Sequence, residues 1–110
     1  MMKKILLLSI LVTGSSSFAG SFEDMQRLDK EIKNLKNKLN LVYKQAYSQT
    51  EAKQELEAAQ KSWLKFKELQ CGNFVVADTQ GSPATVSYDL TCQSILYKQR
   101  ITFIKEMFNL

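Results

Sequence analysis

A long heptad-like seam in the first half of the chain constrains its fold more than any other feature. Apolar residues recur over residues 22–47 at alternating spacings of three and four, which is typical of an amphipathic helix that packs along one stripe. The same seam would suit a coiled-coil homodimer. We favour packing within one chain and expect a monomer, because two further amphipathic segments follow that need a partner. The seam consists of Met25, Leu28, Ile32, Leu35, Leu39, Val42 and Ala46.

A second helical stripe, expected between about residues 51 and 70, contains the only tryptophan. Trp63 lies on that stripe, so we expect its ring to be core rather than a ligand platform. Continuing the first heptad would place Gln49 on the buried side, which predicts a break there, with Ser48 and Glu51 as a capping box for the next helix. One kinked, continuous helix is the alternative, because no glycine or proline stands at the break. The stripe consists of Ala52, Leu56, Ala59, Trp63 and Phe66.

A third helix is expected from Tyr88 onward. Ser82 and Pro83 would suit its cap and first residue, whereas the alternation of apolar residues over 84–90 is typical of a strand, and both interpretations stay open. The apolar surface of this helix is wide, which indicates burial between two neighbours. The three helices together predict an all-α fold, a small antiparallel bundle. The wide face consists of Cys92, Ile95, Leu96, Gln99, Phe103 and Met107, flanked by Leu90, Tyr97, Ile101, Ile104 and Phe108.

The segment between the last two helices, residues 72–83, is rich in turn formers and carries no lysine or arginine. Gly72 and Asn73 are expected to stop the second helix. The apolar residues 74–76 either fold down as a lid on the helix ends or form an exposed contact surface, and we favour the lid.

The first 19 residues have the organisation of a secretory signal peptide. A basic start precedes an apolar run over residues 5–12, and Ser17 and Ala19 are the small residues that a signal peptidase reads. Cleavage after Ala19 would leave one domain, residues 20–110, in the periplasm or outside the cell. The apolar run is shorter than the roughly 20 residues that span a membrane. We therefore expect no membrane span after cleavage. Because no cysteine stands near the cleavage point, we also expect that the protein is not a lipoprotein.

Two cysteines, Cys71 and Cys92, are the only ones in the sequence, and an even number in an exported chain indicates a disulfide. Closing a loop of this size would contribute about 3 kcal/mol, a large share of the stability of a small domain. The complete sequence has 15 basic and 11 acidic residues. Because two of the lysines belong to the signal peptide, the exported domain would be only mildly basic, and a nucleic-acid partner is poorly supported.

Residues suited to catalysis or metal binding are scarce. The sequence contains no histidine, the side chain that most often acts as an acid or base near neutral pH and often binds zinc. Two cysteines alone form no metal site, and their separation differs from that of a thioredoxin-type redox pair. No local motif places a nucleophile beside a base. We therefore expect no enzyme, no metal and no cofactor.

A spaced pattern of residues runs through nearly the whole exported domain. Its centre is an Ala–Gln pair followed by an aromatic residue and a cysteine at fixed offsets, and it ends on a cysteine with an arginine eight residues later. It comprises residues 39–43, Leu56, residues 59–63, Cys71, Gly81, Ser82, Cys92 and Arg100. This pattern resembles the amino-terminal domain family of LprI-like lysozyme inhibitors. The chain departs from the family at Tyr97, where a threonine is expected, and lacks the lipoprotein cysteine of the founding member.

The resemblance implies an exported helical domain with a family disulfide between the two cysteines. It implies packing roles for Tyr43 and Trp63, and it singles out Gln60 and Arg100 as polar family positions. It implies lysozyme as a partner, since one relative inhibits that enzyme. The alternative is an envelope protein-interaction or maintenance module that has no affinity for lysozyme and binds another envelope protein. The family-motif positions are Leu39, Tyr43, Leu56, Gln60, Trp63 and Arg100.

Charge bears on the implied partner. Animal lysozymes are basic, so a mildly basic inhibitor gains little from long-range attraction to them. The segment between the cysteines offers a local solution, because it contains Phe74 and Asp78 without any positive charge. We therefore expect these two residues to form the contact if lysozyme is bound.

Overall fold

The computed structural model describes residues 22–110, and the signal peptide expected over residues 1–19 lies outside that part. The described residues form three main helices and no strand, which confirms the all-α fold and excludes the strand interpretation of residues 84–90. The segments in chain order are α2 (Phe22–Gln49), α3 (Lys53–Lys67), the π-helical η1 (Glu68–Phe74), α4 (Val75–Thr79) and α5 (Thr85–Phe108).

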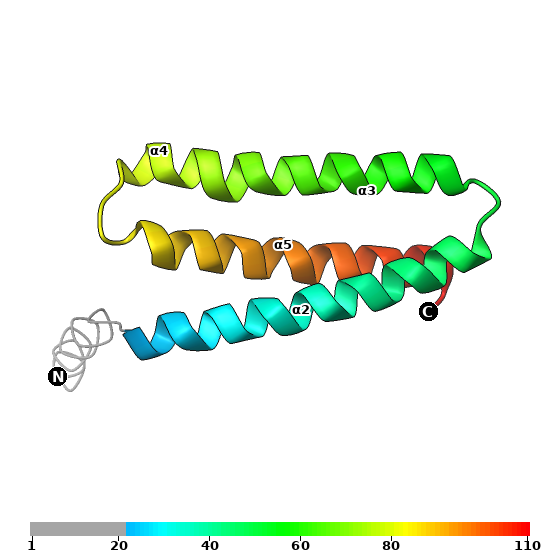
Figure 1. Ribbon diagram of the computed structural model, residues 1–110, viewed down its shortest axis with the longest axis horizontal. Coiled ribbons are helices and arrows are strands. Elements are labelled where there is room, and N and C mark those ends of the chain that lie inside the picture. Colours follow the sequence, from blue (N-terminus) through cyan, green and yellow to red (C-terminus); the bar gives the residue numbers. More distant parts are fainter. Residues whose placement is uncertain (1–21) are drawn as a thin grey trace, which may run out of the picture.

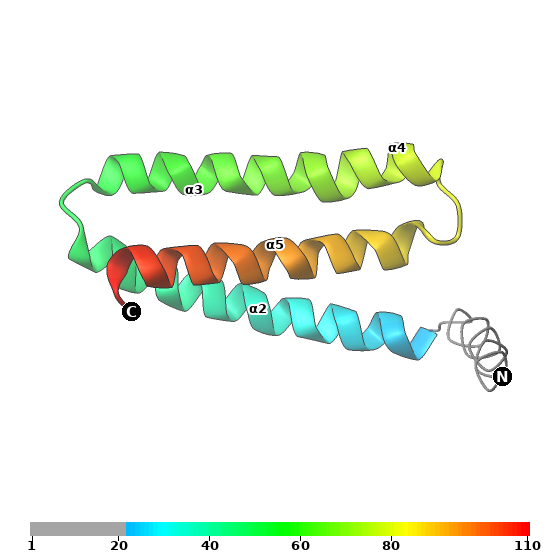
Figure 2. The ribbon, with the colours of Figure 1, turned by 180° about the vertical axis from the view of Figure 1, so that it is seen from behind.

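The segments assemble into three rods that run side by side, with α5 between α2 and a continuous rod made of α3, η1 and α4 (Figure 1). The α3–η1–α4 rod runs antiparallel to its neighbours, so α2 and α5 run parallel to each other. The view from behind shows the same order, with the carboxyl-terminal part of α5 crossing close to the end of α2 (Figure 2). The molecule is elongated, with extents of 65 × 35 × 22 Å.

The core lies between α2 and α5. The heptad seam of α2 is turned toward α5 as predicted, and its central residues are buried. Leu56 and Trp63 of α3 pack against this core from the third rod while staying partly exposed. The seam that a coiled-coil homodimer would use is therefore covered within the chain. The buried cluster consists of Ile32, Leu39, Val42, Ala46, Tyr97, Ile101 and Ile104.

A genuine break separates α2 from α3, which confirms the predicted position and excludes one kinked helix. The proposed capping box is wrong. The Ser48 hydroxyl donates to the carbonyl of Gln45 (2.8 Å), and Ala52 occupies the N-cap of α3 with no side-chain cap. Thr50 stabilises the turn instead, because its Oγ1 accepts a hydrogen bond from the backbone N–H of Ala52 at 3.0 Å.

The second helix does not stop at Gly72 and Asn73, which is the main error of the sequence analysis. Both residues lie inside the π-helical segment, and the rod continues to Thr79. A helical glycine costs about 1 kcal/mol relative to alanine, and the disulfide and the buried Val75 on either side of Gly72 offset that cost. The lid interpretation is wrong as well, because residues 74–76 are helical and only the middle one is buried.

The π-helical segment explains how so long a rod keeps one side against α5. The residues that face inward recur at steps of four, and an α-helix would rotate such a line by about 40° per step. A π-helix closes its hydrogen bonds over five residues and so takes more residues per turn, which keeps the line straight. The inward line is Trp63, Lys67, Cys71, Val75 and Thr79.

The chain reverses at the end of α4 in a Schellman motif. Gln80 adopts a left-handed conformation (φ 54°), and the next residue, Gly81, also has positive φ. The Gly81 N–H donates to the carbonyl of Val76 (3.2 Å), while that of Gln80 donates to Ala77 (3.3 Å). Pro83 therefore precedes α5 rather than opening it, and Ser82 caps the turn by accepting the N–H of Ala84 at 3.3 Å.

The apolar sides of α3 and α5 are rotated from those predicted. Ala52, Ala59 and Phe66 of the α3 stripe are exposed, and Gln60 and Lys67 turn inward in their place. On α5 the flanking residues are the buried ones, whereas most of the predicted central face is open to solvent. That exposed face carries Ile95, Gln99, Phe103 and Met107.

Candidate functional site

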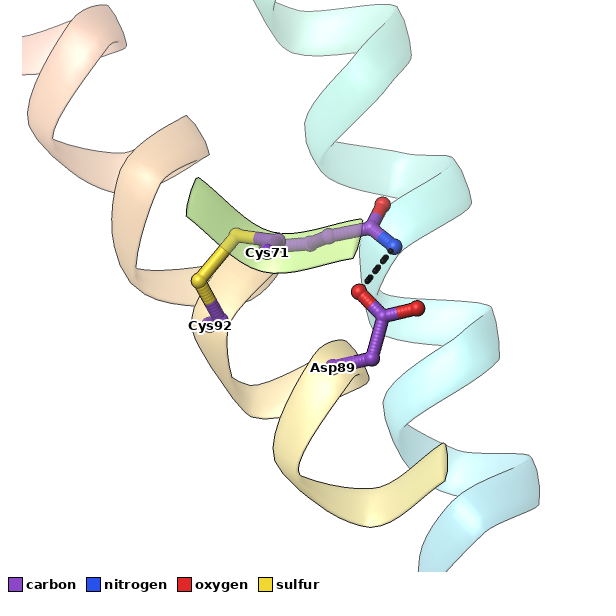
Figure 3. The surroundings of a disulfide bond; sticks show 4 residues. Cys71, Asp89 and Cys92 are labelled. Carbon is purple, nitrogen blue, oxygen red and sulfur yellow. Dashed lines mark hydrogen bonds between the residues drawn. A yellow bond between two sulfur atoms is a disulfide. The ribbon is translucent and has the colours of Figure 1, made fainter. Parts of the chain in front are cut away.

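The disulfide joins the α3–η1–α4 rod to α5. Cys71 of η1 is bonded to Cys92 of α5, with Cα atoms 5.5 Å apart, which confirms the predicted pairing. Cys71 is only 1% exposed, so the bridge lies inside the interface between the rods. Asp89 stands one turn before Cys92 and accepts a hydrogen bond from the amide of Gln93 at 3.0 Å (Figure 3). The bridge fixes the second half of the rod, between α3 and α4, against α5.

Gln60 and Arg100, singled out as polar family positions, are hydrogen-bonded to each other. The Arg100 Nε donates to the Gln60 Oε1 at 3.0 Å and links α5 to α3. The guanidinium also lies over the ring of Phe103, with 5.7 Å between Cζ and the ring centroid. Burial lowers the pKa of Arg100, and the nearby Tyr43 opposes that shift. Arginine titrates so far above neutral pH that the side chain stays charged.

Trp63 contacts α5 one turn farther along the same interface. Its ring meets Tyr97 edge-on, with centroids 5.5 Å apart and an interplanar angle of 65°. Lys67 extends over the same tyrosine ring, its Nζ 5.3 Å from the centroid. Burial raises the pKa of Tyr97, so the phenol stays neutral at physiological pH. Trp63 therefore acts as a packing residue here, and it is half-buried rather than enclosed.

The remaining family-motif positions lie around a groove between α2 and α3. Leu39, which is buried, and Tyr43, which is half-buried, both line this groove, and the ring centroids of Tyr43 and Tyr47 are 6.0 Å apart. Burial is the main reason that the pKa of Tyr43 is raised, and Glu57 adds to the effect. The groove measures about 430 Å³, and its rim mixes lysine, glutamate and amide side chains, so no single charge dominates it. Leu56 packs on the core beside it.

Phe74 and Asp78 lie elsewhere, near the end of the molecule where α4 turns into α5. Both side chains are exposed, and their spacing of four places them on one side of the helical rod. Val75 between them is buried and holds this part of the rod against α5. The structure thus separates the family-motif positions, which join the helices to one another, from the two expected contact residues, which face solvent.

The described residues offer little to a metal or a membrane. Within residues 22–110, no cluster of three or more cysteine, aspartate or glutamate side chains is arranged to hold a metal ion. In the same range, no helix combines the length and apolar character that crossing a bilayer requires.

A comparison with protein-family models shows which family this chain belongs to. The model of the lysozyme inhibitor LprI family matches residues 19–103 of this chain. The chain belongs to the LprI family. Searches of curated proteins and of solved structures returned no match.

Membership of the LprI family agrees with the chemistry of the described residues. The family is one of inhibitors rather than enzymes. Both the family and the disulfide are consistent with a location outside the cytoplasm. The match also covers both cysteines, Gln60 and Arg100, so the contacts between the α3–η1–α4 rod and α5 lie inside the family region.

Two contacts of this site were not predicted from the sequence. The first is made by Tyr97, which was expected only at the flank of the wide apolar face of the third helix. It is among the most deeply buried residues of α5, and its ring contacts Trp63 and Lys67. The second is the Thr79–Thr85 hydroxyl contact (2.6 Å) that closes the turn between α4 and α5, for which the sequence gives no local signal.

Proposed function

We propose that this protein binds lysozyme outside the cytoplasm and inhibits cell-wall hydrolysis by that enzyme. The family match carries the proposal, because it spans residues 19–103 and so includes both cysteines and most of the three-rod fold. The finer location, in the periplasm or secreted after cleavage of residues 1–19, follows from the signal-peptide pattern of the sequence.

The structure supports inhibition by binding rather than by chemistry. A disulfide, a hydrogen bond and an aromatic pair join the α3–η1–α4 rod to α5, and all three contacts fix the shape of the protein. A binding protein whose surface is already ordered loses less conformational entropy when it meets its target. An inhibitor needs such a surface and needs no nucleophile, base or metal.

A lysis assay tests the proposal. Purified, oxidised protein is titrated into lysozymes of different types, and clearing of a bacterial cell-wall suspension is followed by turbidity. We expect the lytic rate of at least one lysozyme to fall with added protein and to level off near one equivalent if binding is tight. Full lytic activity of every lysozyme at a large excess of protein would contradict the proposal.

A specific observation favours the second function, an envelope-interaction module. The outer side of α5 exposes Ile95, Phe103 and Met107, and apolar residues that gather on one side of a helix often contact another protein. Affinity capture from envelope extracts distinguishes the two functions. Recovery of one envelope protein, lost on Phe103→Glu, together with no lysozyme affinity would favour the module.

We also propose that the protein is a monomer. The α2 seam that would have formed a coiled-coil dimer is buried against α5 of the same chain, which supports this state. Light scattering of the oxidised protein should give the mass of one chain, and a doubled mass would contradict it.

A further inference from the structure

Charge is distributed unevenly along this molecule. Residues 68–97 contain Glu68, Asp78 and Asp89 and no lysine or arginine. The rest of the described chain has 13 basic against 8 acidic residues. The small net charge of the described chain is therefore the sum of an acidic segment, residues 68–97, and a basic remainder.

The acidic residues of this segment lie in one half of the elongated fold. Residues 68–97 form η1, α4, the turn and the first half of α5, and these lie side by side in the half of the molecule away from the α2–α3 turn (Figure 1). The first turn of α2, which is acidic as well, lies in the same half of the molecule. Arg27, in the next turn of α2, is paired with Asp24 (Nη1–Oδ1 2.7 Å).

Exposed apolar side chains occur near Asp78 in the sequence and on the facing part of α5. Phe74, Val76, Val86 and Tyr88 are each at least half exposed, at 55%, 50%, 53% and 55%. We call these four residues and Asp78 the tip. Residues two apart on a helix point in nearly opposite directions. Phe74 and Val76 on the α3–η1–α4 rod, and Val86 and Tyr88 on α5, therefore present apolar groups on more than one side of this helical end.

Several contacts inside the molecule hold the tip in place. The disulfide joins η1 to α5 next to the tip, and the buried Val75 packs the start of α4 against α5. At the turn, the Thr79 and Thr85 hydroxyls are hydrogen-bonded at 2.6 Å, and the Schellman motif ends α4. A surface held in this way loses little conformational freedom when it binds in a complementary recess.

We propose that the tip is the surface that enters the substrate cleft of a basic lysozyme. This assignment rests on the proposed function and adds the contact surface and its mode. Phe74 and Val76 would contact the two walls of the cleft, while Asp78 would meet cationic side chains at its rim. Occupation of the cleft excludes the glycan strand, so inhibition needs no chemical step. The acidic half would lead the approach, because opposite charges steer association even when net charges are alike.

Two pairs of matched variants test the assignment. Asp78→Lys reverses a charge at the tip, and Glu106→Lys makes the same change on the exposed surface near the far end of α5. Phe74→Ala removes an aromatic ring at the tip, and Phe66→Ala removes a ring of similar exposure (49%) from the middle of the rod. Inhibition constants and association rates for a basic animal lysozyme are measured at low and high salt. Circular dichroism and thiol titration confirm that each variant is folded and oxidised.

We expect each tip variant to raise the inhibition constant by about tenfold or more, as central interface contacts commonly do. Each control should stay within about twofold of wild type, as surface positions outside an interface do. Asp78→Lys should act mainly on the association rate and reduce its dependence on salt. Wild-type inhibition combined with unchanged inhibition by both tip variants would overturn the tip assignment while leaving the proposed function intact. Absence of inhibition and of binding by the wild-type protein would overturn both.

Discussion

Helix α5 makes two interfaces of different construction. Against α2 it buries a continuous apolar layer, whereas no residue of α3 itself is buried. The α3–η1–α4 rod is held instead by separate attachments: the disulfide, the Trp63–Tyr97 ring contact and the Gln60–Arg100 hydrogen bond. A mutation in a continuous layer leaves a cavity that weakens the packing of its neighbours, whereas a separate attachment can be removed without disturbing the others. We therefore expect mutations to fall into a graded series, with the largest effect in the α2–α5 layer.

The largest effect is expected in that layer. Ile104 is 1% exposed, so Ile104→Ala leaves a cavity and should lower the free energy of unfolding by about 4 kcal/mol. The matched control is Ile95→Ala on the exposed side of the same helix, which should change stability by about 0.5 kcal/mol or less. Urea unfolding measures both. Similar losses in the two variants would show that the α2–α5 interface is not a continuous buried layer.

The disulfide is the strongest of the separate attachments. Replacing both cysteines by serine should lower the free energy of unfolding by about 3 kcal/mol, because the open chain regains conformational freedom when it unfolds. The bridge spans a sequence separation of 21. Wild-type protein under reducing conditions serves as the control and should show a similar loss. An unchanged melting temperature in the double variant would contradict the role given to the bridge.

Helices α2 and α5 also differ in how well their buried sides could be predicted from the sequence. The seam of α2 was predicted correctly because most of its apolar residues share one side of the helix, and exposed ones such as Leu41 are few. Helix α5 has apolar residues all round, including Tyr97 and Ile104 on one side and Ile95 and Phe103 on the other. Periodicity shows that such a helix is helical but not which side meets its neighbours. That choice depends on how all three rods pack.

The extension of the rod past Gly72 was unpredictable for a related reason. Local propensity favours a stop there, and only the tertiary attachments at Cys71 and Val75 overrule it. For the site, the disulfide followed from the number of cysteines and the export pattern. Gln60 and Arg100 were identified as notable positions, but their contact depends on the register between α3 and α5, which no local pattern encodes.

Trp63 should contribute less than a fully enclosed tryptophan. Its ring is half-buried against Tyr97, so Trp63→Ala should cost about 2 kcal/mol, below the roughly 3–5 kcal/mol typical of a core aromatic. Trp63→Phe should recover most of that loss because it keeps an aromatic contact. Thermal and urea unfolding would measure both variants. A loss as large as that of Ile104→Ala would place α3 in the continuous layer and remove the contrast.

The hydrogen bond between Gln60 and Arg100 should contribute about 1 kcal/mol. A double-mutant cycle isolates it: Gln60→Ala, Arg100→Ala and the combination of the two are compared with wild type. Because the side chains contact each other at 3.0 Å, we expect a coupling energy near that value. Strictly additive losses would show that each residue acts through other contacts, such as the stacking of Arg100 on Phe103.

The smallest effect should come from an ion pair at the edge of the α2–α5 layer. Lys98 Nζ lies 2.9 Å from Glu31 Oε2, and the Ser94 hydroxyl donates to the same oxygen at 3.3 Å. The hydrogen bond from Lys98 is the main reason that the pKa of Glu31 is lowered from its ordinary value of 4.5, against an opposing effect of burial. A lowered pKa in the folded state means that the pair stabilises the protein above about pH 4.5, and that this contribution is lost as pH falls through the folded pKa.

The stabilisation by this pair is limited by its exposure, since the two side chains are 59% and 37% accessible. Solvent-exposed pairs contribute about 0.2–1 kcal/mol and weaken in salt. Glu31→Gln should therefore lower stability by about that amount at pH 7, and the difference from wild type should shrink at pH 3, because the carboxylate becomes protonated as pH falls through its lowered pKa. Urea midpoints at the two pH values measure this. An equal difference at both would mean that Glu31 acts through packing, and the edge of the layer would then be as continuous as its centre.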